Sequence, residues 1–157
     1  MLHESTGDQV AENRHFGELD TIAKVKVRTE QAKLRKLLAG GAEVAECALC
    51  GDRYPLRFLV AAHIKKRAVC TDEERRQLHH IAMLACSFGC DALYESGWIT
   101  VDQHGNLQVP ARDSLPEGNL RDRLSHLRGR GCTAHSAASE PYFAWHRTTM
   151  FQGRSTT

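Results

Sequence analysis

Apolar residues recur at helical spacing between residues 20 and 41, in the segment DTIAKVKVRTEQAKLRKLLAGG. Asp20 can act as an N-cap and Gly40-Gly41 as a C-terminal stop, so this segment is predicted to form one helix of about twenty residues. Its periodic positions are Ile22, Val25, Leu34, Leu37 and Leu38. Its many Lys and Arg residues could contact phosphates, although a charged run on a helix is usually a solvated face. Residues 1–19 are polar and without periodicity, which is typical of a disordered tail.

Short apolar runs alternate with polar segments in the central part of the chain, residues 42–109. FLVAAHI, which contains His63, and IAMLA have the length and composition of buried strands. Between them, Thr71 is followed three residues later by Glu74, a capping box that predicts a short surface helix. SFGCDALYESG is typical of a helix of two to three turns, and WITVDQHGNLQV predicts a β-hairpin that turns near Gly105. This alternation predicts an α+β fold.

The last segment, residues 110–157, has a weaker pattern. Pro110 and Pro116 interrupt the chain, NLRDRLSHLRG is a short amphipathic helix candidate, and YFAWHRTTMF collects aromatic side chains. We expect this segment to pack on the core as a helical C-terminal extension.

The composition indicates one soluble domain, because 157 residues with 41% hydrophobic content can close a single modest core. No apolar run approaches the roughly 20 residues that span a bilayer, and the first fifteen residues contain no signal-peptide core. We therefore expect an intracellular, cytoplasmic protein without a membrane partner. A formal net charge of +2 neither requires nor excludes a polyanionic partner.

Six cysteines in an intracellular chain require an explanation, because a reducing compartment disfavours disulfides. Four of them form two close pairs, Cys47-x2-Cys50 and Cys86-x3-Cys90, and the two pairs are separated by about a strand, a loop and a second strand. This spacing predicts a structural zinc site of four thiolates. Free buried cysteines are the alternative interpretation, and Cys70 or Cys132 could replace a member of the quartet.

His63 ends the first apolar strand between two small residues, Ala61 and Ala62, and three cations, Lys65, Lys66 and Arg67. A histidine satisfied within the core is the usual interpretation of one such residue. Here the small neighbours leave access, and the cations would bind or steer a polyanion, which favours a nucleic-acid-binding segment.

The layout of a strand ending in histidine, a loop, a strand and a helix with a hard oxygen ligand resembles the HNH, or ββα-metal, nucleases. LVAAHIKK is similar to the first-strand motif of that family, LHHIAMLA to its central segment, and CDALYESGWITVDQHGNL to its third segment. The AAHI motif resembles a subgroup of predicted restriction-type endonucleases, in which an aspartate, here Asp91, is common at the third position. VRTEQAKLRKLL resembles the helix that precedes the domain in that subgroup.

The resemblance implies a ββα-metal core with a zinc knuckle over residues 42–109, an N-terminal helix before it and a C-terminal helical extension after it. It implies a metal-dependent endonuclease in which His63 is the general base and Asp91 binds a catalytic Mg²⁺, with Mn²⁺ or Zn²⁺ as substitutes. The remaining ligand of that ion is open, with Glu95, a histidine or substrate oxygens as candidates. His80 stands at the usual asparagine position, and Ala62 stands where several relatives carry a metal ligand.

The implied substrate is DNA, with RNA not excluded, and a homodimer would help double-strand cleavage. Two other functions fit parts of the sequence. A non-catalytic zinc-ribbon module that binds nucleic acid would need the cysteines and the basic loop only. An inactive nuclease scaffold for protein interaction would explain the histidine at position 80.

Overall fold

The computed structural model describes residues 6–153, with side chains from residue 17 onward. By its internal contacts the chain divides into two units, Met1–Lys33 and Leu34–Thr157. The expected tail over residues 1–5 lies outside the described residues.

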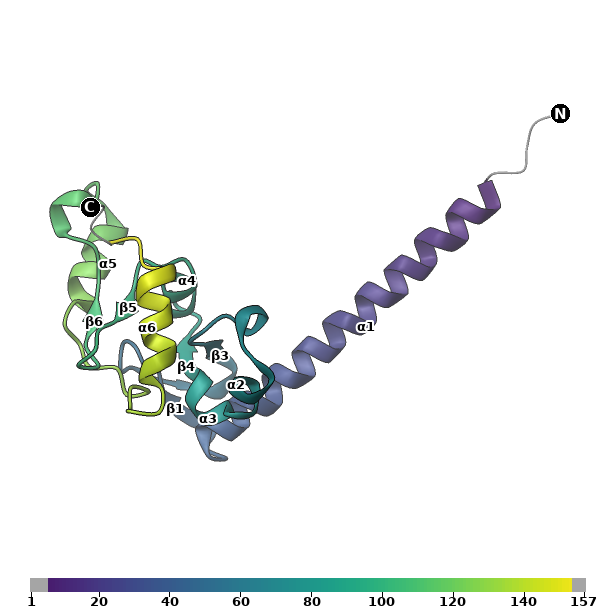
Figure 1. Cartoon of the computed structure of the whole chain (residues 1–157). Coiled ribbons are helices and arrows are strands. Elements are labelled where there is room, and N and C mark those ends of the chain that lie inside the picture. Colours follow the sequence, from purple (N-terminus) through teal and green to yellow (C-terminus); the bar gives the residue numbers. More distant parts are fainter. Residues whose placement is uncertain (1–5, 154–157) are drawn as a thin grey trace. The chain divides into compact units, whose positions relative to one another are not determined.

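Helix α1 spans Thr6–Ala39 and therefore begins well before the start predicted at Asp20 (Figure 1). Tail residues 6–19 are thus helical here, contrary to the expected disorder, because a formed helix extends through polar residues at little cost per residue. In the first unit, Ile22 and Val25 are exposed, so their helical spacing does not mark a packed face. In the second unit, Leu34 is buried in the core and Arg35 donates a hydrogen bond to the Leu59 carbonyl at 3.4 Å.

Over its described residues, 34–153, the second unit contains three antiparallel two-stranded sheets. They are β1 (Val44–Glu46) with β2 (Arg53–Pro55), β3 (Leu59–His63) with β4 (Ala82–Cys86), and β5 (Thr100–Val101) with β6 (Leu107–Gln108). The register of the middle pair sets Leu59 opposite Cys86 at one end and His63 opposite Ala82 at the other. Every residue of β4 is buried, as predicted for IAMLA.

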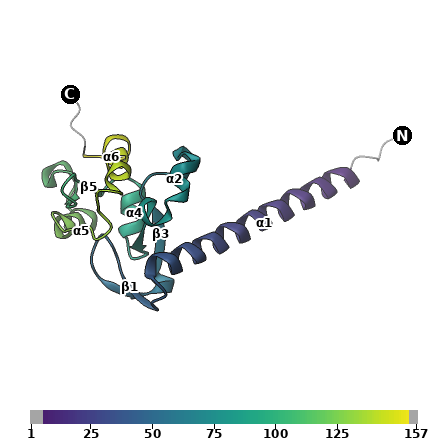
Figure 2. The ribbon, with the colours of Figure 1, turned by 60° about the horizontal axis from the view of Figure 1, so that its bottom comes forward.

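In the part of the chain that the structure describes, five further α-helices connect and cover these hairpins (Figures 1 and 2). They are α2 (Asp72–Arg76), α3 (Leu78–Ile81), α4 (Cys90–Glu95), α5 (Asn119–Leu127) and α6 (Glu140–Thr149). Single 3-10 turns lie at Leu56–Phe58 (η1), Arg67–Val69 (η2) and Arg112–Ser114 (η3). The capping box predicted for α2 is present, since Thr71 and Glu74 each accept a hydrogen bond from the other's backbone N–H. The architecture is the expected mixed α+β fold.

The core of the second unit joins the hairpins to the C-terminal helices. Leu124 and Leu127 of α5 and Phe143 of α6 are almost fully buried in the same cluster as Leu59 and Ile81. At about 25 cal/mol per Å² of apolar surface, each such side chain contributes roughly 1.5–3 kcal/mol relative to an exposed position. The aromatic segment YFAWHRTTMF therefore contributes Tyr142 and Phe143 to the hydrophobic core.

Candidate functional site

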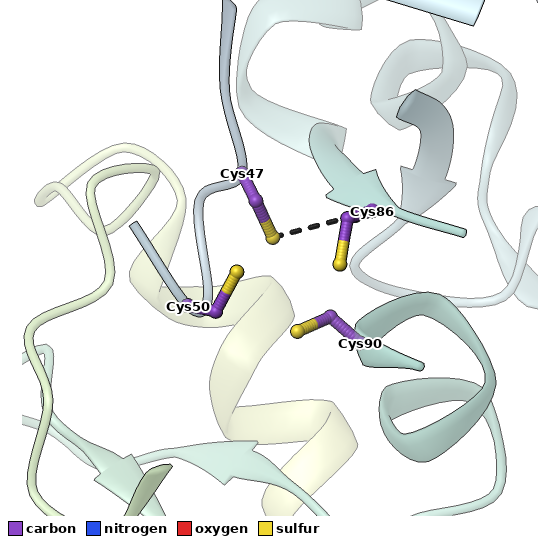
Figure 3. A group of neighbouring side chains, drawn as sticks. All are labelled: Cys47, Cys50, Cys86 and Cys90. Atoms are coloured by element: carbon purple, nitrogen blue, oxygen red, sulfur yellow. Dashed lines mark hydrogen bonds between the residues drawn. The ribbon is translucent and has the colours of Figure 1, made fainter. Parts of the chain in front are cut away.

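Four cysteines from three elements meet inside the second unit (Figure 3). Cys47 and Cys50 lie in the turn between β1 and β2, Cys86 ends β4, and Cys90 begins α4. Their sulfur atoms all lie within 4.8 Å of one another, and no residue of the four is more than 2% exposed. This confirms the grouping predicted from the two pairs.

Local backbone geometry explains why these pairs can converge. The first turn closes with hydrogen bonds from Gly51 N–H to the Cys47 carbonyl at 3.0 Å and from Cys47 N–H to the Asp52 carbonyl at 2.8 Å. Gly51 has a φ of 78°, which favours glycine. The Cys86 N–H donates to the Cys47 sulfur at 3.3 Å and so links the second pair to the first.

The donor set fits zinc. A tetrahedral zinc–thiolate centre with bonds near 2.3 Å requires sulfur atoms about 3.8 Å apart, which is compatible with the spacing of these four. Hydrogen bonds from the Cys86 and Cys90 side chains lower the pKa of Cys47, whereas burial raises the pKa of Cys50 to about 12. Without a cation, burial and mutual repulsion disfavour the ionisation of several of these four thiols at once. A bound divalent cation would allow all four to be thiolates together.

Arg123, on α5, supplies a positive charge beside this cluster. Its guanidinium donates to the Cys90 sulfur at 3.8 Å. One zinc ion with four thiolates carries a net charge of −2, so this contact would offset part of that charge. Arg123 is not recognisable from the sequence, because α5 lies about thirty residues beyond Cys90 and its amphipathic pattern carries no information about a metal centre.

Cys70 and Cys132 lie outside the cluster. The Cys70 thiol lies 3.3 Å from the Lys66 carbonyl, and burial raises its pKa. Burial also raises the pKa of Cys132 to about 11. Among the described residues, the group of metal-ligating side chains contains neither, so neither replaces a member of the quartet.

His63 is the last residue of β3 and is half-buried. Burial, and next the charge of Arg67, lower its pKa, so its imidazole is neutral at neutral pH. Because side chains alternate along a strand, His63 shares a face of the hairpin with Leu59 and with the cross-strand residue Cys86. Five strand residues separate the two ends of the hairpin by about 13 Å.

Asp91 and His80 occupy different surroundings. Asp91 is half-buried as the second residue of α4, and burial, Glu95 and Cys86, in that order, raise its pKa. His80 is exposed on α3, where its backbone N–H donates to the Gln77 carbonyl at 2.9 Å. In the described part of the chain no hydrogen bond or ion pair joins His63, His80 and Asp91 to one another, so their joint role stays a prediction.

Of the three predicted phosphate-binding cations, Lys65, Lys66 and Arg67, the first forms an ion pair within the protein. The Lys65 ammonium contacts both carboxylate oxygens of Glu74, at 3.0 and 3.1 Å, and both side chains are about four-fifths buried. Lys66 and Arg67 are exposed. Lys65 therefore closes the loop onto α2, and Lys66 and Arg67 are the residues of this trio that face solvent.

A buried polar contact between α4 and α6 was not predicted from the sequence. The His146 ring stacks on the Tyr94 ring at 3.7 Å, its Nε2 lies 2.8 Å from the Tyr94 carbonyl, and its Nδ1 lies 2.8 Å from the Thr100 hydroxyl. A carbonyl only accepts, so Nε2 carries the proton and Nδ1 accepts from Thr100. The Tyr94 hydroxyl donates to the Ile64 carbonyl at 2.9 Å, next to His63. Burial lowers the pKa of His146 to about 4.

Comparison with known proteins assigns no family to this chain. No family model matches the sequence, and no curated protein matches it at a significant level. In the part of the chain that the structure describes, no helix has both the length and the apolar character needed to span a membrane.

Proposed function

We propose that this chain is a zinc-stabilised, metal-dependent nuclease that hydrolyses phosphodiester bonds of DNA, with His63 as the general base. The observation that carries the proposal is the position of His63 at the end of β3, just before the exposed Lys66 and Arg67. Its imidazole is half-buried and has a lowered pKa, which keeps it neutral at neutral pH. A neutral imidazole can accept a proton from water as that water attacks phosphorus.

The surroundings of His63 support access by a nucleic acid. Ala61 and Ala62 precede it and fill little space, and Lys66 and Arg67 follow it with exposed side chains. These cations would hold the phosphate backbone without reading its sequence. Tyr94 fixes the adjacent Ile64 carbonyl and so restrains the chain segment that carries the base.

Asp91, with Glu95 one turn later on α4, would provide oxygen ligands for a catalytic cation. Two carboxylates suit Mg²⁺, which is commonly held by one or two carboxylates, substrate phosphate oxygens and waters. When bound, such an ion would stabilise negative charge on the phosphate and on the leaving oxygen. His80 would act on the segment that carries His63 through its chain neighbour Ile81, whose carbonyl accepts a hydrogen bond from the Ile64 N–H at 2.8 Å.

Cleavage assays on plasmid, single-stranded DNA and RNA with added Mg²⁺ or Mn²⁺ test this function. His63→Ala should reduce the rate by about 10²- to 10⁴-fold while zinc content and DNA binding stay unchanged. The matched control is His104→Ala, since His104 is exposed in the β5–β6 turn.

Asp91→Ala should also reduce the rate, with partial recovery at higher metal concentration. His80→Asn should retain activity. If His63→Ala cuts as fast as the parent, the catalytic assignment is wrong.

A non-catalytic zinc module that binds nucleic acid is the second candidate. One observation favours it. Among the described residues, the cluster of metal-ligating side chains that the structure shows is made of the four cysteines, and it includes neither His63 nor Asp91. Binding without cleavage of any substrate in the same assays would select this function. The absence of both binding and cleavage would favour an inactive scaffold.

A further inference from the structure

Three aromatic side chains from separate segments gather beside the four-cysteine cluster. Phe88 lies in the turn between Cys86 and Cys90, Tyr54 lies on β2, and Phe58 ends η1. The rings of Tyr54 and Phe88 are stacked, with centroids 5.0 Å apart and an interplanar angle of 24°. Phe58 and Phe88 are 5.5 Å apart and tilted by 41°. We call these three residues the aromatic platform.

Phe88 is the exposed member of the platform. Its side chain is 58% exposed, a value exceeded among the exposed large apolar residues of the described chain by Ile22 and equalled by Val27, whereas Tyr54 and Phe58 are partly buried. The turn does not depend on this ring, because Ser87 N–H donates to the Phe58 carbonyl at 2.8 Å and both flanking cysteines point into the cluster. Phe88 therefore presents a planar apolar surface to solvent on a rigid support.

Arginines accompany the platform. The Arg57 guanidinium lies over the Phe58 ring, with 4.8 Å between its Cζ and the ring centroid, and Arg53 is exposed next to Tyr54. Acidic groups are also near: Glu46 is the cross-strand partner of Arg53, and the charge of Asp52 acts on Tyr54. The local charge thus suits one or two phosphates and not a long tract of duplex backbone.

An exposed aromatic ring with a few cations beside it is suited to binding unpaired nucleobases. Every base has a π-face that can stack on an aromatic side chain, whereas the bases of an intact duplex are already stacked on each other. Arginine adds a phosphate contact and cation–π attraction. A protein partner could also bury Phe88, but its binding would not depend on nucleobases. Binding experiments with and without bases therefore separate a protein partner from a nucleic acid.

We propose that the aromatic platform binds single-stranded nucleic acid by stacking an unpaired base on Phe88, with Arg57 contacting a neighbouring phosphate. This inference deepens the proposed function, because it names the form of substrate held next to the zinc centre. It concerns binding alone and does not depend on cleavage at His63.

The test is binding of a fluorescent oligothymidine and of an abasic strand of equal length, measured by anisotropy without added divalent cation. The parent protein should bind oligothymidine at least about fivefold more tightly than the abasic strand, because stacking requires the base. Phe88→Ala and Phe88→Leu should both remove this difference, and Phe88→Trp should retain it. Leu120→Ala is the matched control, since Leu120 is an exposed apolar residue on α5. Zinc content is measured for each variant.

Salt dependence separates stacking from charge. The logarithm of the binding constant should fall by about 0.7 per phosphate contact for each tenfold increase in salt, so a slope near −0.7 to −1.4 is expected. Arg57→Gln should make the slope about 0.7 less steep. Equal affinity for both strands, or unchanged oligothymidine binding by Phe88→Ala, would overturn the proposal. Binding that survives His63→Ala while cleavage is lost supports it and leaves the proposed function intact. Binding by a parent that cuts no substrate supports it and removes the proposed function.

Discussion

The two ends of the β3–β4 hairpin differ in how they are closed. At the Leu59–Cys86 end, four cysteines are at most 2% exposed and are surrounded by core residues. At the His63–Ala82 end, His63 is half-buried, and Lys66, Arg67 and His80 are exposed. A structural metal site is stabilised by exclusion of water, whereas a site that acts on a polymer must remain open to it. The hairpin therefore has one closed end lined by cysteines and one end where charged side chains are exposed.

The largest expected effect comes from the closed end. Cys86→Ser should abolish stoichiometric zinc and unfold the second unit, because structural zinc can contribute about 10–16 kcal/mol of apparent binding energy to folding. Cys70→Ser is the matched control, because Cys70 is buried outside the cluster and a serine hydroxyl can replace its contact with the Lys66 carbonyl. Elemental analysis and thermal unfolding measure both. A folded, zinc-free Cys86→Ser protein would contradict the metal assignment.

Acid should act on the contact that joins α4 to α6. The folded pKa of His146, about 4, is below the unfolded value near 6.5, so the native state holds the imidazole neutral. As the pH falls from about 6.5 towards 4, the unfolded state binds a proton that the native state does not, and stability decreases. The full loss is about 3 kcal/mol. Urea unfolding at several pH values measures it.

The variant His146→Gln should lose this component of the pH dependence. If that variant does not fold, NMR titration of the His146 ring in the parent is decisive. Protonation of the ring near pH 6.5 would show that burial does not control it.

A substitution of Arg123 tests whether zinc binding at the closed end depends on a positive charge from the C-terminal extension. Arg123→Gln should weaken zinc binding about 10- to 100-fold, the usual cost of removing an outer-shell partner. Arg128→Gln is the control, since Arg128 lies at the end of α5 and donates to the Pro110 carbonyl, away from the sulfurs. Competition with a chelator gives the affinities. Equal zinc affinity in both variants would mean that the contact with Cys90 has no electrostatic role.

The smallest effect is expected at the link between the two ends. Tyr94→Phe removes the hydroxyl that donates to the buried Ile64 carbonyl and should cost about 1–3 kcal/mol of stability with zinc content unchanged. If His63 depends on this link for its position, cleavage should fall more than stability explains. An activity that follows only the folded fraction would restrict Tyr94 to a structural role.

The sequence by itself determined the features that depend on neighbours along the chain. The spacing of Cys47, Cys50, Cys86 and Cys90 indicated the cluster, because two close cysteine pairs at turns can converge on one metal ion. The capping box before α2 and the buried composition of β4 are equally local and were confirmed. The start of α1 was predicted wrongly, because polar residues without periodicity can still extend a helix that apolar residues define.

Only the tertiary structure decided which distant side chains meet. Arg123 reaches Cys90, His146 stacks on Tyr94, and Lys65 is neutralised by Glu74, although no periodicity links the members of these pairs. Phe88 likewise gains Tyr54 and Phe58 as neighbours only when β2, η1 and the turn between Cys86 and Cys90 pack together. Hydrophobic burial and pair contacts depend on distance in space, and these partners, 9 to 52 positions apart in the sequence, have no fixed distance until the chain has folded.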